Sequence, residues 1–120
     1  MTLKHKPTRI FAIDLDGLAI GAIGIHPQED IFAKNAELGY WLAEAYWGRG
    51  IVTESIKDII QYGFETFDIQ RVFARPFGTN IGSQKVLEKA GFLLEAKLKQ
   101  TIYKNDLYHD ELIYGIRRKD

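Results

Sequence analysis

Apolar and polar residues alternate over the first third of the chain, and this alternation predicts strands. Residues 9–16 place apolar side chains on one face, and the Asp16-Gly17 pair that follows favours a two-residue hairpin turn. Residues 18–26 are apolar and β-compatible, and residues 36–45 alternate again after a polar stretch. We therefore expect a hairpin and then a third strand in this part of the chain.

From about residue 52 the spacing of apolar residues changes from the two-residue period of a strand to the period of a helix. Small or apolar residues recur at intervals of three and four, at Val52, Ile56, Ile59, Ile60, Gly63 and Phe67. We expect this helix to end near Phe67. Residues 71–77 predict a short strand, which Pro76 and Gly78 stop.

A second helix and two more strands complete the predicted order. Asn80 suits the N-cap of this helix and Gly91 its C-terminal end. The face expected to be buried consists of Ser83, Val86, Leu87 and Ala90. Residues 92–104 and 108–117 are rich in strand formers and flank the turn-like KNDL. The order β-β-β-α-β-α-β-β, without repeats or a linker, predicts one mixed α/β (α+β) domain over residues 1–120.

Composition narrows the function classes. The chain of 120 residues has no cysteine, which excludes disulfides, thiolate metal sites and a cysteine nucleophile and fits a cytoplasmic location. Sixteen basic and sixteen acidic residues give a formal net charge of zero. This balance gives the chain no electrostatic reason to bind nucleic acid or an anionic membrane, and no apolar run is long enough to span a bilayer. We therefore expect neither as a partner.

The stretch YWGRGIVTES, residues 46–55, joins a strand to a helix through two glycines. A helix N-terminus presents unpaired N–H groups and the positive end of the helix dipole, so it favours phosphate oxygens. Gly48 and Gly50 would let an anion approach the backbone, Arg49 adds charge, and the Thr53 hydroxyl can donate. A tight turn without a ligand is the alternative interpretation. The spacing matches neither a Walker loop nor a dinucleotide fingerprint.

Two segments carry a family resemblance. ELGYWLAEAYWGRGIVTES, residues 37–55, followed by NIGSQKVLEKAGF, residues 80–92, resembles the GNAT superfamily of acetyl-CoA-dependent N-acetyltransferases. The resemblance is greatest to its branch of ribosomal-protein N-terminal alanine or serine acetyltransferases. It implies a mixed, mostly antiparallel sheet flanked by helices, with acetyl-CoA (coenzyme A) as the cofactor.

The resemblance also implies a set of cofactor-binding residues. The backbone from Trp47 to Thr53 would hold the pyrophosphate, and the strand at Trp41, Leu42 and Ala43 would part from its neighbour to admit the pantetheine arm. Asn80 would touch the amide chain and Ser83 the sulfur. The cofactor loop so implied comprises Trp47, Gly48, Arg49, Gly50, Val52 and Thr53. The chain departs from the family pattern in having Trp47 in place of Gln or Arg and Val52 in place of Gly or Ala.

Acetyl transfer to an amine needs a base, a donor for the developing oxyanion and a group that stabilises the departing thiolate. No metal is required. Glu37 is the first choice of base, with a merely solvated strand glutamate as the alternative; some relatives carry a glutamate at the position of Ile102. The N–H near Leu42 suits the oxyanion, and Ser83 or a tyrosine suits the thiolate.

We therefore expect an N-acetyltransferase that moves an acetyl group from acetyl-CoA to a primary amine, such as a protein N-terminus, by direct transfer in a ternary complex. The family normally has a strand and two helices before the first hairpin, and these form much of the acceptor wall. Their absence ahead of residue 9 indicates either a truncated chain or a wall that another subunit supplies, and the uncovered strand edge leads us to expect a homodimer. It also sustains an alternative, a module that binds acyl-CoA but has lost its acceptor site.

Overall fold

The computed structural model describes residues 8–119. Its elements follow the predicted order, with two short 3-10 helices added. They are β1 (Ile10–Leu15), β2 (Leu18–Pro27), η1 (Asp30–Phe32), β3 (Asn35–Leu42), η2 (Glu44–Tyr46), α1 (Ile51–Thr66), β4 (Arg71–Ala74), α2 (Ile81–Lys89), β5 (Leu93–Lys104) and β6 (Leu107–Arg117). The α/β class and the element order predicted from the sequence are confirmed.

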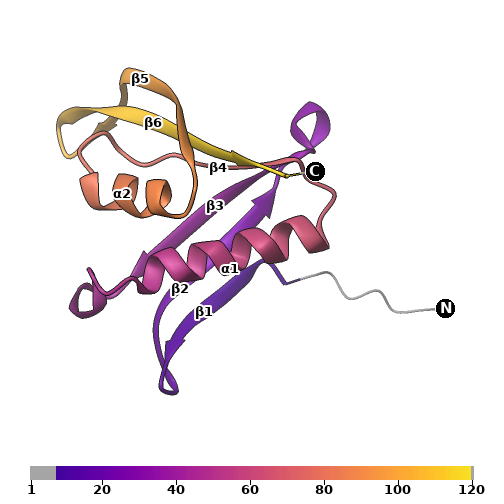
Figure 1. Cartoon of the computed structure of the whole chain (residues 1–120). Coiled ribbons are helices and arrows are strands. Elements are labelled where there is room, and N and C mark those ends of the chain that lie inside the picture. Colours follow the sequence, from indigo (N-terminus) through magenta and orange to yellow (C-terminus); the bar gives the residue numbers. More distant parts are fainter. Residues whose placement is uncertain (1–7, 120) are drawn as a thin grey trace.

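The six strands form one sheet in the order β1-β2-β3-β4-β6-β5 (Figure 1). Every neighbouring pair is antiparallel except β3 and β4, which are parallel because α1 crosses over between them. β1 and β5 are the edges of the sheet. The mixed, mostly antiparallel sheet that the family resemblance implied is therefore present.

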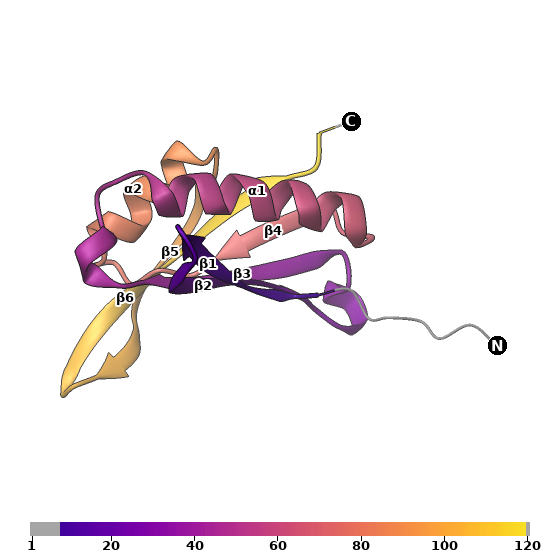
Figure 2. The ribbon, with the colours of Figure 1, turned by 90° about the horizontal axis from the view of Figure 1, so that it is seen from below.

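Both long helices cover the same side of this sheet, and the β5–β6 hairpin extends away from them (Figure 2). The helix face predicted from the spacing of apolar residues is the buried one, with Ile56, Ile59 and Ile60 in the core against β2. On α2 only Leu87 is fully buried, and the remaining predicted positions are partly exposed. More residues of α1 than of α2 are therefore buried in the core. The N-termini of both helices lie toward the same side of the molecule (Figure 1).

Two strands are shorter than the sequence predicted. The alternating residues 36–45 end as a strand at Leu42, and the chain turns into η2 after the Ala43 N–H makes its bond to the Ile20 carbonyl, 2.8 Å from nitrogen to oxygen. The strand predicted over residues 71–77 ends at Ala74. Pro76 has no N–H to continue the ladder, and only an isolated bridge to Glu111 involves the residues that follow.

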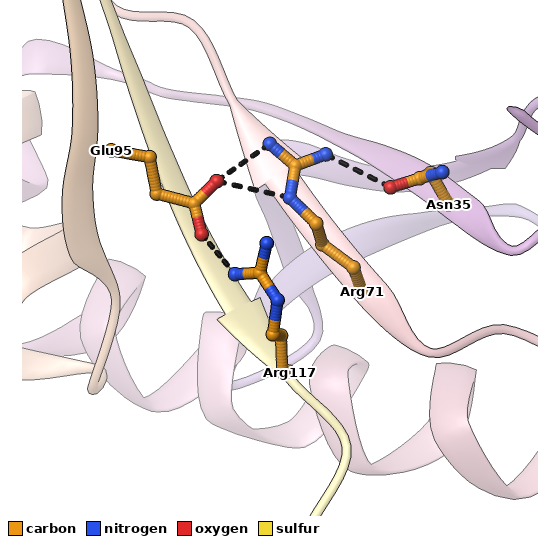
Figure 3. Close-up of polar contacts among 4 residues, drawn as sticks. All are labelled: Asn35, Arg71, Glu95 and Arg117. Atoms are coloured by element: carbon orange, nitrogen blue, oxygen red, sulfur yellow. Dashed lines mark hydrogen bonds and ion pairs between the residues drawn. The ribbon is translucent and has the colours of Figure 1, made fainter.

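A partly exposed ion cluster links four strands on the face opposite the helices (Figure 3). Glu95 on β5 accepts hydrogen bonds from Arg71 on β4, at 2.7 and 3.0 Å, and from Arg117 on β6. Arg71 also donates to the Asn35 amide oxygen of β3, 2.9 Å away. Burial raises the pKa of the Glu95 carboxyl, but the bonds and charges of the two arginines outweigh it, and the pKa lies below its usual value.

Replacing Glu95 with glutamine should therefore destabilise the protein in a pH-dependent way. Folding lowers the pKa of this carboxyl, so its contribution is present above the ordinary glutamate pKa and is lost as the pH falls through the folded-state value. Urea unfolding should show a loss of stability at pH 7 that shrinks below about pH 4. Glu29→Gln, at an exposed residue with no capping bond, is the control. A pH-independent loss would contradict this account.

Candidate active site

The sheet parts between β3 and β4. The two strands pair only where Asn35–Glu37 meets Arg71–Phe73, after which β3 continues beside β2 and β4 continues beside β6. The opening is a cleft of about 900 Å³ bounded by β3, the end of β4 and the N-terminal ends of α1 and α2. The parting predicted for this part of β3 is thus a feature of the backbone.

Backbone groups of β3 point into this cleft. Along an antiparallel pair, successive residues direct their N–H and C=O groups alternately toward and away from the partner strand. The Gln28 N–H donates to the Asn35 carbonyl, 2.9 Å away, and the Ala43 N–H is used by Ile20, so the odd-numbered residues of β3 face β2. Tyr40 and Leu42 therefore turn their backbone groups toward the opening.

The carbonyl of Leu42 accepts a hydrogen bond from the indole nitrogen of Trp47, 2.7 Å away. This bond links the glycine loop to the end of β3. Trp47, which stands in place of the Gln or Arg of the family pattern, therefore has a structural role. The N–H of Leu42 stays directed at the cleft. The N–H of Ala43, in contrast, donates to the Ile20 carbonyl of β2. Ala43 is the one predicted cofactor-binding residue that does not line the cleft.

The N-terminus of α1 opens on the cleft without a cap. Gly50 is the N-cap residue with φ of 76° and provides no side-chain cap, and Gly48 has φ of 75°. Within residues 8–119 no hydrogen bond reaches the amide groups of Ile51, Val52 or Thr53. Three unpaired donors at the positive end of a 16-residue helix form an anion site.

No side chain obstructs this loop. A Cβ built on Gly48 or on Gly50 would meet nothing within 4 Å, so the space beside the backbone is open to a ligand. Arg49, between them, lies over the ring of Tyr46, with the guanidinium carbon 5.6 Å from the ring centroid. The loop therefore fits a diphosphate held by main-chain amides, with one cation beside it.

The N-terminus of α2, in contrast, is capped. The Asn80 side-chain oxygen accepts a bond from the Ser83 N–H at 3.0 Å, as the sequence predicted for the N-cap. Within residues 8–119 no hydrogen bond uses the amide nitrogen of Asn80, and Asn80 lines the cleft. The Ser83 hydroxyl is hydrogen-bonded to the hydroxyl of Tyr40 on β3, which joins the two walls of the cleft.

Glu37 lies where β3 and β4 begin to part, and it is held by Arg75. The guanidinium donates to both carboxylate oxygens, at 2.8 and 3.2 Å, and also lies 3.7 Å from the carboxylate of Glu111 on β6. The hydrogen bond with Glu37 raises the pKa of Arg75, and the glutamate charges add to the effect. Glu37 is therefore a fixed carboxylate at the cleft rather than a freely solvated one.

The structure thus brings the predicted site residues together around one opening. Those that line the cleft are Glu37, Trp41, Leu42, Trp47, Gly48, Arg49, Gly50, Val52, Thr53, Asn80 and Ser83. Sequence reasoning gave no role to Arg75 or to Tyr40. The local sequence does not indicate either contact, because the partners of these residues are 38 and 43 positions away.

The parted sheet and the uncapped helix end define the class of coenzyme A-dependent acetyltransferases. Residues 2–93 match the family model described as an acetyltransferase (GNAT) domain, and the chain belongs to the GNAT acetyltransferase family. It is 34% identical over 105 residues to the putative ribosomal N-acetyltransferase YdaF of Bacillus subtilis, and the match covers 88% of this chain and 57% of that protein. To the ribosomal-protein-serine acetyltransferase of Escherichia coli it is 32% identical, covering 89% of this chain and 59% of the relative.

A solved structure extends the likeness to the fold. The structure of RimL, a ribosomal L7/L12 alpha-N-protein acetyltransferase in complex with coenzyme A, matches with a TM-score of 0.72 and 31% identity over 82% of this chain and 55% of that one. The chain thus spans a little over half the length of the relatives it matches. Neither helix described within residues 8–119 has the length and apolarity needed to cross a membrane.

Proposed function

We propose that this chain, as a single domain over residues 1–120, is an N-acetyltransferase that uses acetyl-CoA to acetylate a primary amine in a ternary complex. One observation carries the proposal: the uncapped amides of α1 open on a cleft formed where β3 and β4 part. A diphosphate at this helix end leaves the rest of an extended cofactor to lie along β3. The cofactor would supply the acetyl group as a thioester.

The residues of the chain fit the binding part of this proposal. The amides of Ile51, Val52 and Thr53 would hold the diphosphate, with Arg49 adding charge. The backbone groups of Tyr40 that face the opening would pair with the pantetheine amides as a neighbouring strand would. The free amide nitrogen of Asn80 would complete these contacts from α2.

The same geometry supports the chemical roles that we propose. The N–H of Leu42 would donate to the charge that develops on the acetyl oxygen. Ser83, in the first turn of α2, would stabilise the departing sulfur, and the positive end of that helix would add to this effect. Glu37 would accept the proton of the amine through water, and Arg75 fixes its position. A peptide α-amine, with a pKa of roughly 8, is a less demanding acceptor than lysine.

The relatives support a proposal for the acceptor class, because their names describe acetylation of ribosomal proteins. We propose a protein N-terminus as the acceptor, and a cytoplasmic setting. The test is thiol release from acetyl-CoA with a panel of N-terminal peptides and small amines, beside calorimetric binding of coenzyme A. Turnover on a peptide supports the proposal. Binding without turnover on any amine would favour the acyl-CoA-binding module, and absence of binding would refute both.

We also propose that the chain forms a homodimer. β1 is an edge strand, and beside it lies a groove of about 560 Å³ between β1 and α1, whose lining includes apolar residues such as Phe11 and Tyr62 and charged ones such as Glu54 and Asp58. An open strand edge favours association. Sedimentation equilibrium at micromolar concentration should give twice the chain mass, and a stable monomer would contradict the proposal.

A further inference from the structure

We infer that Tyr40 is a positioning residue, whose hydroxyl donates a hydrogen bond to Ser83 and so directs the Ser83 O–H at the sulfur of the cofactor. This inference rests on the proposed function and deepens it. It concerns a hydrogen-bond arrangement and moves no proton. Tyr40 and Ser83 stand 43 residues apart, and both line the cleft.

The placement of the two hydroxyls carries the inference. Tyr40 extends from the part of β3 that has lost β4 as a neighbour, and Ser83 lies in the first turn of α2. Their hydroxyls bond each other across the space between strand and helix. The Ser83 N–H is already used by the Asn80 cap, 3.0 Å away, so both the backbone and the side chain of this serine are held.

The direction of this bond follows from the acidity of the two hydroxyls. A phenol is more acidic than an aliphatic alcohol and is therefore the better donor of the pair. Burial raises the pKa of Tyr40, and the bond to Ser83 offsets only part of this rise. The phenol is therefore protonated at neutral pH and can donate. Ser83 then accepts through its oxygen and keeps its own proton for another acceptor.

Among the described residues, the hydroxyl of Ser83 makes no bond to the backbone. A serine within a helix commonly donates to the carbonyl four residues earlier. Ser55 on α1 does so, donating to the Ile51 carbonyl at 2.9 Å. For Ser83 the corresponding carbonyl is that of Thr79, and no such bond is present among the described residues. Tyr40 thus occupies the serine oxygen and leaves the cleft as the direction open to its proton.

The test compares binding of coenzyme A with that of desulfo-coenzyme A, which lacks the thiol, by calorimetry on the whole chain. The wild-type protein should bind coenzyme A about threefold more tightly, the effect of one weak hydrogen bond to sulfur. Tyr40→Phe and Ser83→Ala should each abolish this preference, while binding of desulfo-coenzyme A stays unchanged. The double variant should show no further loss, because Tyr40 acts through Ser83.

Tyr46→Phe is the matched control, because it removes another tyrosine hydroxyl from the lining of the same cleft. It should keep the preference for the thiol. Equal wild-type affinity for both ligands, or a preference that survives in Tyr40→Phe, would overturn the inference. A folded Tyr40→Phe protein that binds neither ligand would also overturn it, because positioning affects only the sulfur contact. Wild-type protein that binds neither ligand would refute the proposed function itself.

Discussion

Replacing Gly50 with valine is expected to raise the dissociation constant for coenzyme A at least about 100-fold, the equivalent of two lost charge-assisted hydrogen bonds. Gly50 is the N-cap of α1 at φ of 76°, where a β-branched residue is strongly disfavoured. Valine would either displace the amides of the first turn or place its methyl groups in the space that a diphosphate needs. Calorimetric titration with coenzyme A measures the change.

The matched control for this substitution is Gly17→Val in the β1–β2 hairpin. Gly17 has φ of 84° and, like Gly50, no neighbour within 4 Å of a built Cβ. The two variants therefore carry a similar backbone strain, but only Gly50 lines the cleft. Gly17→Val should lower the unfolding temperature and leave the affinity unchanged. Equal affinity in the Gly50 variant would show that the α1 amides do not hold the diphosphate.

Replacing Ser83 with alanine should lower the rate of acetyl transfer about 100-fold and leave the affinity for acetyl-CoA within about threefold, because the interaction strengthens as negative charge develops on sulfur. The thioester sulfur of the bound cofactor is a weak acceptor, so the ground state gains little from the serine hydroxyl. Steady-state kinetics with an accepted amine, giving kcat and KM separately, measures the effect.

Ser55→Ala is the corresponding control. It removes a hydroxyl that bonds the Ile51 carbonyl of its own helix and does not line the cleft, so it should leave kcat unchanged. A Ser83→Ala protein that raises KM and keeps kcat would move this serine from the transfer step to cofactor binding. Together with the Gly50 pair, these variants separate loss of the cofactor from loss of the reaction.

The binding half of the site could be predicted from the sequence because its determinants are local. Gly48 and Gly50 stand directly before the helix whose amides they expose, and Asn80 caps a helix that begins at the next residue. Within such segments, a few neighbouring residues and the helix geometry decide which backbone groups are free. The parting of β3 from β4 was expected from the family resemblance and is seen in the strand pairing.

The environment of the proposed catalytic groups could not be predicted in this way. Nothing in the local sequence shows that Arg75 holds Glu37 or that Tyr40 bonds Ser83, since each pair joins different elements. The alternation over residues 36–45 likewise suggested a longer strand than β3. Where that strand ends depends on the partner residues that β2 and β4 provide.

The sequence by itself determined the class of fold, the order of the elements and the two helix ends that face the cleft. Those features follow from periodicity, glycine conformation and capping, which act over a few residues. Only the tertiary structure decided which side chains meet across the opening and where β3 leaves β4 as a neighbour. Such contacts depend on how β3, β4 and α2 pack in space, and this packing cannot be predicted from the spacing of residues along one segment.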